Sequence, residues 1–338
     1  MAGRGASELV GSLLAFATQP KGNPHRLDSP RYTLPLLAHD YPALTPAMWN
    51  ACYERFGLGV RNVTMVCAAA DLGEVLGALR ADDRYAGGGV GVGLKAEALR
   101  HLDHIDPLAE AAGAVNVVQK NRDGSLTGHN TDGDGYVRSL EEALEAAGRS
   151  LGGLKVLMLG AGGTGRAIAL ALARQGAEIV VLNRTAQRAA TLATHVNRFV
   201  GRPACRAGGE GQLRAEAPGA DVIVNVSTKG ATGPLERYCA LAEAPVPVTP
   251  EQVEQNREAS RNLLASVPTN TIISDVVLRN GPTPTLALAQ ELGFPTLDGV
   301  GMVVHQGVEA FCLLHDAELQ AAGVTKSEVA VEMRKAAG

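Results

Sequence analysis

The chain has 338 residues, of which 46% are hydrophobic and 20% charged, and its formal net charge is −4. These values are typical of a globular protein with two domains. The negative charge argues against a surface for nucleic acid or acidic lipid, and the aromatic content of 4% offers few platforms for stacking bases. We therefore expect no nucleic-acid partner.

Nothing in the sequence suggests a membrane protein. No run approaches the ~18 apolar residues that a membrane span requires. Residues 9–17 are mildly apolar, but Gly11 and Ser12 interrupt them, so a signal peptide is not expected. The five cysteines are scattered without C-x-x-C spacing, which fits reduced thiols. We expect a cytoplasmic protein with no membrane partner.

The first half of the chain alternates short apolar runs with helical patterns, as α/β domains do. Predicted strands cover residues 32–38, 62–67, 90–94 and 114–118, and predicted helices cover residues 46–56, 71–80 and 95–101. Pro35 would confine the first strand to a sheet edge, because proline has no N–H to donate. Thr45 before Pro46 is the pattern of a helix N-cap. A long helix ending near Gly148 is predicted to bridge the two domains.

A glycine-rich turn lies near the middle of the chain. Residues 160–165 read Gly-Ala-Gly-Gly-Thr-Gly, between an apolar run and an alanine-rich helical stretch. Gly160, Gly162 and Gly165 fit the G-x-G-x-x-G spacing: the first makes the turn, the second lets a pyrophosphate approach, and the third packs helix on strand. A second apolar run at residues 178–182 completes a β-α-β unit, which predicts a dinucleotide site.

The end of that second strand indicates which dinucleotide is bound. NAD sites usually place an acidic residue there for the ribose hydroxyls. This chain has Asn183, Arg184 and Thr185, with Arg188 one helical turn later. Two guanidinium groups suit a 2′-phosphate, so we predict NADP. The alternative is that both arginines are solvated charges on a helix surface.

The rest of the second half continues the strand and helix pattern. Predicted strands cover residues 221–226 and 271–277, and a helix covers residues 283–293. Residues 230–268 hold several prolines and a charged helix, so we expect a surface excursion there. Thr325 with Glu328 forms the capping box of a terminal helix.

At Lys95, Asn116 and residues 130–133 the chain resembles the shikimate dehydrogenase family. That family carries a lysine after a glycine-rich strand, a G-A-V-N segment, and an N-T-D-G segment before the bridging helix. The matching segments here are Lys95, residues 113–116 and residues 130–133. The second half agrees in its G-A-G-G-T-G, N-R-T, N-V-S-T-K-G and D-G-V-G-M-V-V-H-Q segments.

The resemblance implies an α/β fold with two domains and a cleft between them. Residues 1–131 plus 303–338 would form a substrate domain with a mostly parallel sheet, and residues 132–302 a Rossmann NADP-binding domain. The implied activity is that of an alcohol dehydrogenase of aromatic amino acid biosynthesis. It would transfer a hydride reversibly between NADP(H) and a ring hydroxyl or ketone of shikimate, 3-dehydroshikimate, or a related cyclic hydroxy acid or polyol. A homodimer is one expectation for the assembly.

The resemblance also assigns roles to individual residues. Lys95 would take the hydroxyl proton as hydride leaves, and Asp132 would hold it. Thr45, Asn116 and Gln306 would bind substrate. The cofactor would be bound by Gly160, Gly162, Gly163, Thr164, Gly165, Asn183, Arg184, Thr185, Arg188, Val226, Ser227, Gly299 and Met302. Without the resemblance, Lys95 reads as a solvated lysine, Asp132 as an N-cap and Asn116 as a turn residue.

The chain departs from the family where substrate carboxylate would be bound. Ala43 and Thr45 stand in place of two serines, Gly89 and Gly91 in place of asparagine and threonine, and Leu278 in place of a tyrosine. Each charge-assisted hydrogen bond is worth ~1.5–3 kcal/mol, so losing several should disfavour shikimate. We expect a related, bulkier cyclic polyol or hydroxy acid, with quinate as the nearest alternative. Nothing in the sequence places Arg31 or His39 as a replacement anchor.

Other classes of protein remain open. A folate-type methylene dehydrogenase also uses a lysine, but the N-T-D-G and H-Q segments argue against it. A non-catalytic NADP-binding sensor is favoured by the lost substrate donors and opposed by the retained Lys95 and Asp132. His101 and His104 form an H-x-x-H pair without a third ligand at useful spacing, so no metal is expected.

Overall fold

The computed structural model describes residues 31–38 and 43–337. The apolar stretch 9–17 and His39 lie outside the described residues. The chain divides into two compact units: unit 1 is Met1–Gly135 with Val303–Gly338, and unit 2 is Tyr136–Met302. Both boundaries fall inside helices, α5 (Asp132–Ala146) and α11 (Gly299–Ala322), so these two helices connect the units. None of the described helices is both long enough and apolar enough to cross a membrane.

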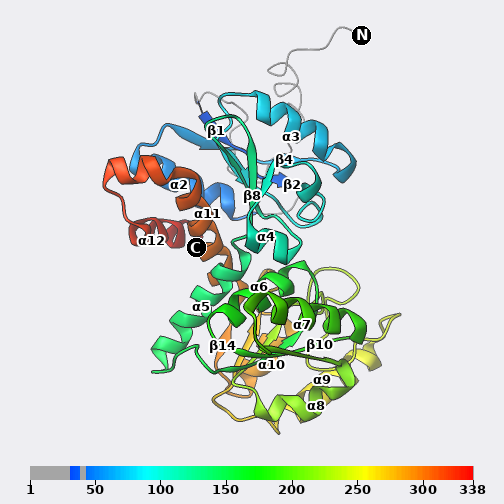
Figure 1. Cartoon of the computed structure of the whole chain (residues 1–338). Coiled ribbons are helices and arrows are strands. Elements are labelled where there is room, and N and C mark those ends of the chain that lie inside the picture. The colour runs from blue at the N-terminus through cyan, green and yellow to red at the C-terminus, as the bar shows by residue number, and fades with distance from the viewer. Residues whose placement is uncertain (1–30, 39–42, 338) are drawn as a thin grey trace. The chain divides into compact units, whose positions relative to one another are not determined.

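Unit 1 is a mixed α/β unit (Figure 1). Its strands are β1 (Arg31–Thr33), β2 (Leu36–Leu37), β3 (Val60–Asn62), β4 (Met65–Val66), β5 (Gly87–Gly89), β6 (His104–Ile105), β7 (Val117–Lys120) and β8 (Leu126–His129). Its helices are α2 (Thr45–Phe56), η1 (Ala69–Asp71), α3 (Leu72–Ala81), η2 (Ala98–Arg100), α4 (Pro107–Ala112), α12 (Lys326–Ala337), the start of α5 and most of α11.

The first strand lies inside the sheet, so the prediction of an edge strand is wrong. Strands β1 and β2 pair in parallel with β3 and β4. On the other side, the Leu34 N–H donates to the Gly87 carbonyl over 3.0 Å. Pro35 is tolerated there because it falls in the break between β1 and β2, and its carbonyl still accepts from the Met65 N–H at 2.9 Å.

The glycine-rich segment forms its strand earlier than predicted. Strand β5 occupies residues 87–89 and pairs antiparallel with β7. A side chain at Gly88 would collide with the Leu34 carbonyl, so the close approach of the two backbones requires glycine. The helix predicted at residues 95–101 is only a turn followed by the short η2. The Lys95 carbonyl nevertheless accepts from the Val115 N–H at 2.8 Å, which ties this turn to the sheet.

Unit 2 contains a six-stranded, fully parallel sheet in the order β11-β10-β9-β12-β13-β14. The strands are β9 (Lys155–Leu159), β10 (Glu178–Asn183), β11 (Cys205–Gly209), β12 (Val222–Asn225), β13 (Ile272–Asp275) and β14 (Thr296–Leu297). The helices are α6 (Gly163–Arg174), α7 (Ala186–Val200), η3 (Glu210–Gln212), α8 (Leu213–Glu216), η4 (Ala217–Gly219), α9 (Pro250–Leu264), α10 (Pro284–Glu291) and the rest of α5. This is the strand order of the doubly wound dinucleotide-binding fold, as predicted.

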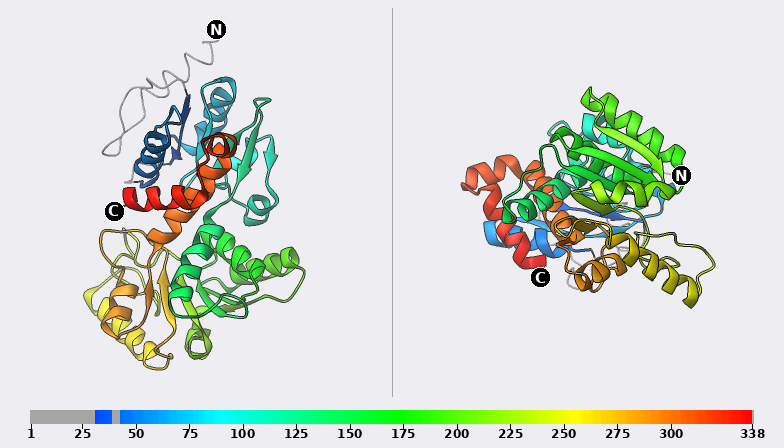
Figure 2. Two further views of the ribbon diagram at one scale, coloured as in Figure 1. Left: turned by 90° about the vertical axis from the view of Figure 1, so that its left-hand side faces the viewer. Right: turned by 90° about the horizontal axis from the view of Figure 1, so that it is seen from below.

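Residues 230–268 form part of the core of unit 2, so the prediction of a surface excursion is wrong. Cys239, Leu241 and Leu263 are buried in the same cluster as residues of β9 and β12. The buried Asn256 side chain bonds to both the N–H and the carbonyl of Cys239, at 2.9 and 3.0 Å. Figure 2 shows the yellow and orange helices α9 and α10 on one face of the sheet and the green α6 and α7 on the other.

A buried histidine interrupts α11 in unit 1. His315 has φ −124° and ψ 22°, values outside the helical range. Its Nε2 lies 2.8 Å from the Tyr53 hydroxyl, and that hydroxyl lies 3.0 Å from the Thr33 Oγ1. Burial lowers the pKa of His315 from 6.5 to about 4.

This histidine should make the fold sensitive to acid. The unfolded chain binds a proton here near pH 6.5 but the folded chain only near pH 4, so stability falls as pH drops between those values. The loss from one such group approaches ~1.4 kcal/mol per pH unit. His315→Gln keeps a polar group near Tyr53 and does not titrate. In urea unfolding at two pH values, about 7.5 and 5, its stability should fall less than that of the wild type. Equal falls would contradict a neutral buried imidazole.

Candidate active site

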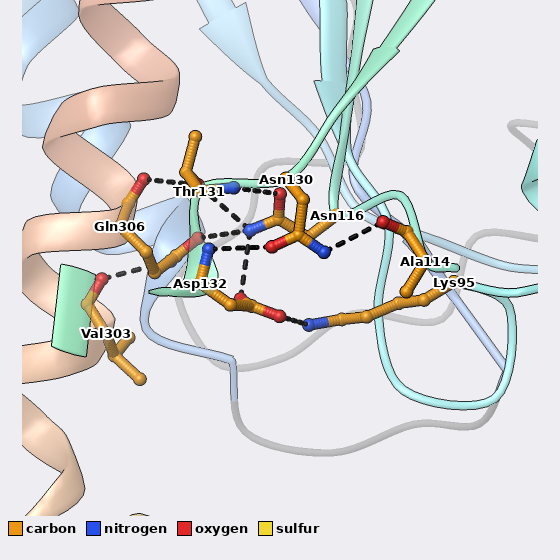
Figure 3. A network of polar contacts seen from close by, with 8 residues as sticks. All are labelled: Lys95, Ala114, Asn116, Asn130, Thr131, Asp132, Val303 and Gln306. Atoms are coloured by element: carbon orange, nitrogen blue, oxygen red, sulfur yellow. Dashed lines mark hydrogen bonds and ion pairs between the residues drawn. The ribbon is translucent and has the colours of Figure 1, made fainter. Parts of the chain in front are cut away.

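An ion pair in unit 1 joins the two residues that the sequence expects to meet. The Lys95 Nζ lies 2.6 Å from the Asp132 Oδ2 (Figure 3). The side chains are 21% and 7% exposed, respectively. The ammonium can therefore be reached by a ligand, while the carboxylate behind it is almost fully buried.

The carboxylate is held by the segment that begins α5. Asp132 is the first residue of this helix, and its N–H donates to the Asn130 Oδ1 over 3.1 Å. The Asn130 amide in turn donates to the Ala114 carbonyl over 2.8 Å. The Asp132 Oδ1 accepts from the Asn116 Nδ2 at 2.9 Å, and the Oδ2 accepts from Lys95. Because each oxygen has its own donor, the carboxylate has one favoured orientation.

Asn116 is the centre of this hydrogen-bond network. Its Oδ1 accepts from the Thr131 N–H at 2.8 Å. Its Nδ2 lies 2.9 Å from both the Thr131 Oγ1 and the Asp132 Oδ1, and 3.2 Å from the Gln306 Oε1. An amide group has only two protons for these three acceptors. The contact with Gln306 is the longest of the three.

Gln306 reaches the network from α11 (Figure 3). Its Nε2 donates to the Val303 carbonyl over 3.0 Å, and its backbone carbonyl accepts from the Thr131 hydroxyl at 3.0 Å. The structure thus brings together the predicted residues Lys95, Asp132, Asn116 and Gln306. The prediction from sequence did not include Thr131 and Asn130, which hold these residues in place. The N-T-D-G segment was the available signal, since its polar side chains precede a helix and can cap or brace it.

An amine beside a carboxylate, open to a ligand on one side, can exchange a proton with a ligand oxygen. Asn116 and Thr131 make internal hydrogen bonds that fix the position of Asp132. A contact of Asn116 with a ligand stays a prediction.

Thr45 is the remaining predicted substrate residue. It is the first residue of α2, the capping position is Leu44, and no side chain caps this helix. The prediction that Thr45 is the N-cap is therefore wrong. Its hydroxyl forms no hydrogen bond among the described residues, and its contact with a substrate stays a prediction. Arg31 is not free to bind a substrate carboxylate, because its guanidinium donates to the Glu318 carboxylate over 2.7 Å.

The glycine positions leave room beside this network. Gly89 has a negative φ, and a Cβ there would have its nearest neighbours, at Asn116 and Pro35, 3.8 Å away. This spacing is ordinary van der Waals contact, so a Cβ would fit at Gly89 without strain. Gly89 is therefore not required by the fold, in contrast to Gly88.

The glycine turn of unit 2 has the properties that its spacing predicts. Gly160 has φ +123°, and a Cβ there would lie 3.0 Å from the Ser227 nitrogen. A Cβ at Gly165 would lie 2.9 Å from the Val226 Cγ2. Both positions require glycine. Gly162 is the N-cap residue of α6. A Cβ added there would have no neighbour within 4 Å, so the backbone at this position is open to a ligand.

The other predicted cofactor residues follow the carboxyl ends of β9, β10 and β14. Gly163 and Thr164 form the first turn of α6, Asn183 ends β10, and Thr185 precedes α7. Arg184 and Arg188 are exposed there. Gly299 and Met302 lie in the first turn of α11, with a Cβ at Gly299 2.7 Å from the Val276 carbonyl oxygen. Contact of these residues with a cofactor stays a prediction.

Two family descriptions and a protein of known name match this chain. Residues 41–118 match the shikimate dehydrogenase substrate binding domain, and residues 141–225 match the shikimate / quinate 5-dehydrogenase family. The chain is 32% identical over 269 residues to the shikimate dehydrogenase (NADP(+)) of Desulfitobacterium hafniense. That alignment covers 80% of this chain and 86% of the relative.

Two solved structures resemble this chain over most of its length. The shikimate 5-dehydrogenase of Thermus thermophilus, in complex with NADP(H) and shikimate, has a TM-score of 0.67 and 30% identity, covering 90% of this chain and 99% of that one. The ligand-free 5-ketofructose reductase of a Gluconobacter species has a TM-score of 0.68 and 28% identity, covering 92% of this chain and 99% of that one.

Proposed function

Because this chain belongs to the shikimate dehydrogenase family, we propose that it is an NADP-dependent oxidoreductase acting on a CH–OH group of a small cyclic molecule. The observation that carries this proposal is the 2.6 Å ion pair between Lys95 and Asp132. Oxidation of an alcohol removes a hydride from carbon and a proton from oxygen, so the site needs a group that handles the proton.

The residues of unit 1 perform the proton step. In the oxidative direction, the neutral amine of Lys95 accepts the substrate hydroxyl proton as the carbon–hydrogen bond breaks. In the reductive direction, its ammonium returns that proton to the carbonyl oxygen. Asp132 keeps the Lys95 nitrogen in place, and Gln306 accepts from a neighbouring hydroxyl. NADP(H), when bound, would supply or accept the hydride.

The residues of unit 2 fit NADP. The open backbone at Gly162, beside the start of α6, suits a pyrophosphate. The exposed guanidinium groups of Arg184 and Arg188 suit a 2′-phosphate, and β10 ends in Asn183 where an NAD site would have a carboxylate. The relative from D. hafniense is itself named for NADP.

We propose that the substrate is a cyclic polyol or hydroxy acid other than shikimate. Glycine at positions 89 and 91 and alanine at 43 provide no side-chain donor for a carboxylate, and Gly89 leaves space. The similarity to a 5-ketofructose reductase supports an uncharged, hydroxyl-rich substrate. Quinate is the second candidate, because one of the two matching families is named for it. The only observation that favours a non-catalytic NADP-binding sensor is the loss of side-chain donors for a substrate carboxylate.

Steady-state kinetics with NADP over shikimate, quinate and uncharged cyclic polyols tests the substrate. We expect shikimate to give a kcat/KM below ~10⁴ M⁻¹s⁻¹, the lower end of the usual range, and another member of the panel to exceed it. Gly89→Asn, whose Cβ would meet only ordinary van der Waals contacts, should improve shikimate relative to the uncharged polyols. A shikimate kcat/KM within the usual range for the wild type would refute the substrate proposal. NADP binding without reduction by any substrate would favour the sensor.

Removing the amine tests the proton step. Lys95→Ala should lower kcat by ~10²–10⁴, the usual contribution of a general acid or base, and leave NADP affinity nearly unchanged. Lys335→Ala, which removes an exposed lysine from α12, is the matched control and should keep full activity. If the Lys95 variant retained most of its turnover, another group would carry the proton.

Removing one guanidinium tests the cofactor. Arg184→Ala should weaken NADP(H) binding by ~1.5–3 kcal/mol and barely change NAD(H) binding, because only NADP(H) has the 2′-phosphate. Arg198→Ala, at the far end of α7, is the control and should change neither. Titration calorimetry measures both. Equal losses for the two dinucleotides would defeat the assignment of Arg184 to the phosphate.

A further inference from the structure

Unit 2 contains a cavity of about 280 Å³ at the carboxyl end of its sheet. Its apolar lining includes Leu159 of β9, Leu182 of β10 and Leu263 of α9. Its polar lining includes Glu210, which follows β11, and Lys229, which follows β12. Apolar walls with a few polar groups are typical of a small-molecule subsite.

The cavity adjoins the residues that we assign to the cofactor. Leu159 directly precedes Gly160, and Leu182 lies two residues before Arg184. Ser227 lines the cavity, and its nitrogen is 3.0 Å from where a Cβ at Gly160 would lie. In NADP the 2′-phosphate and the adenine are attached to one ribose. A phosphate held by Arg184 therefore brings the adenine to the end of β10, where the cavity begins.

Four charged residues line the cavity, namely Glu210, Arg214, Lys229 and Glu243. Glu210 and Lys229 form an ion pair and so offer one acceptor beside one donor. The Lys229 Nζ lies 3.1 Å from the Glu210 Oε1 and donates to the Ala242 carbonyl over 2.8 Å. The Lys229 and Glu210 side chains are 12% and 28% exposed. An ammonium has three protons, so one remains after these two contacts, and the carboxylate keeps unused lone pairs.

This pattern is complementary to adenine. The base presents its 6-amino donor next to a ring-nitrogen acceptor on either edge. A carboxylate can accept from the amino group while the neighbouring ammonium donates to the ring nitrogen. The leucine side chains supply apolar contact for the faces of the ring.

We propose that Glu210 and Lys229 recognise the adenine edge of the dinucleotide, with Glu210 accepting from the 6-amino group. This inference rests on the proposed function, because it takes NADP as the ligand. It also gives the segment 230–268 a role, since Ala242 and α9 complete the wall of the cavity.

A purely structural ion pair would predict a different behaviour. If Glu210 and Lys229 only tied the segment 230–268 to the end of β11, breaking the pair would lower stability. It would not make the protein sensitive to the identity of the base. A comparison of two dinucleotides that differ only in the base separates these roles.

The test is titration calorimetry of the full-length protein with NADP and with nicotinamide hypoxanthine dinucleotide phosphate. The analogue has a 6-oxo acceptor in place of the 6-amino donor. The 6-position is therefore reversed on both edges of the base, while the ring nitrogen becomes an N–H donor only at N1. The wild type should bind it ~10–100-fold more weakly, as expected for one hydrogen bond to a charged group. In Glu210→Gln, whose amide can turn its donor toward the oxo group, the two dinucleotides should bind within about threefold of each other.

The control is Glu216→Gln. It removes the same charge from α8, where Glu216 pairs with Arg206 at 2.9 Å, and should keep the preference of the wild type. Equal binding of both dinucleotides by the wild type would overturn the inference without requiring any variant to fold. A preference that survives in Glu210→Gln would also overturn it. If the wild type bound neither dinucleotide, the proposed function would fail, and this inference with it.

Discussion

The fixed orientation of the Asp132 carboxylate is the constraint on which the active site depends. Asn116 occupies one of its oxygens and Lys95 the other, while Asn130 holds its backbone N–H. The carboxylate is nearly buried, so an unpaired charge there would be costly, and this cost keeps the Lys95 amine beside it. The polar side chains before α5 therefore serve chiefly to place one nitrogen where a ligand can reach it.

The sequence predicts the features that leave few physical alternatives. The turn at residues 160–165 is predictable because a side chain at Gly160 or Gly165 would collide with Val226 or Ser227. Strands β9, β10, β12 and β13 contain short apolar runs, which are typical of the buried strands of a parallel sheet. The pairing of Lys95 with Asp132 follows from motif order and not from any local pattern, since 37 residues separate them.

The features that could not be predicted from the sequence are those that depend on tertiary packing. Strand β11 reads Cys-Arg-Ala-Gly-Gly, which has neither alternation nor an apolar run, and forms because β10 is available for pairing. Thr45 has the composition of an N-cap, yet Leu44 occupies that position. The prolines and charges of residues 230–268 suggest a surface loop, but the leucines of α9 pack on the sheet. The composition of a segment indicates how exposed its residues are on average. It does not show whether one apolar stripe packs its helix against the sheet.

A double-mutant cycle tests most directly whether Lys95 and Asp132 act as one unit. The kcat of Lys95→Met, Asp132→Asn and the double variant would be measured with the best substrate of the wild type. Groups that work only together give non-additive losses, so the double variant should be slower than the worse single variant by no more than about threefold. Losses that multiply would mean that the two residues act independently, and would contradict the account of the site.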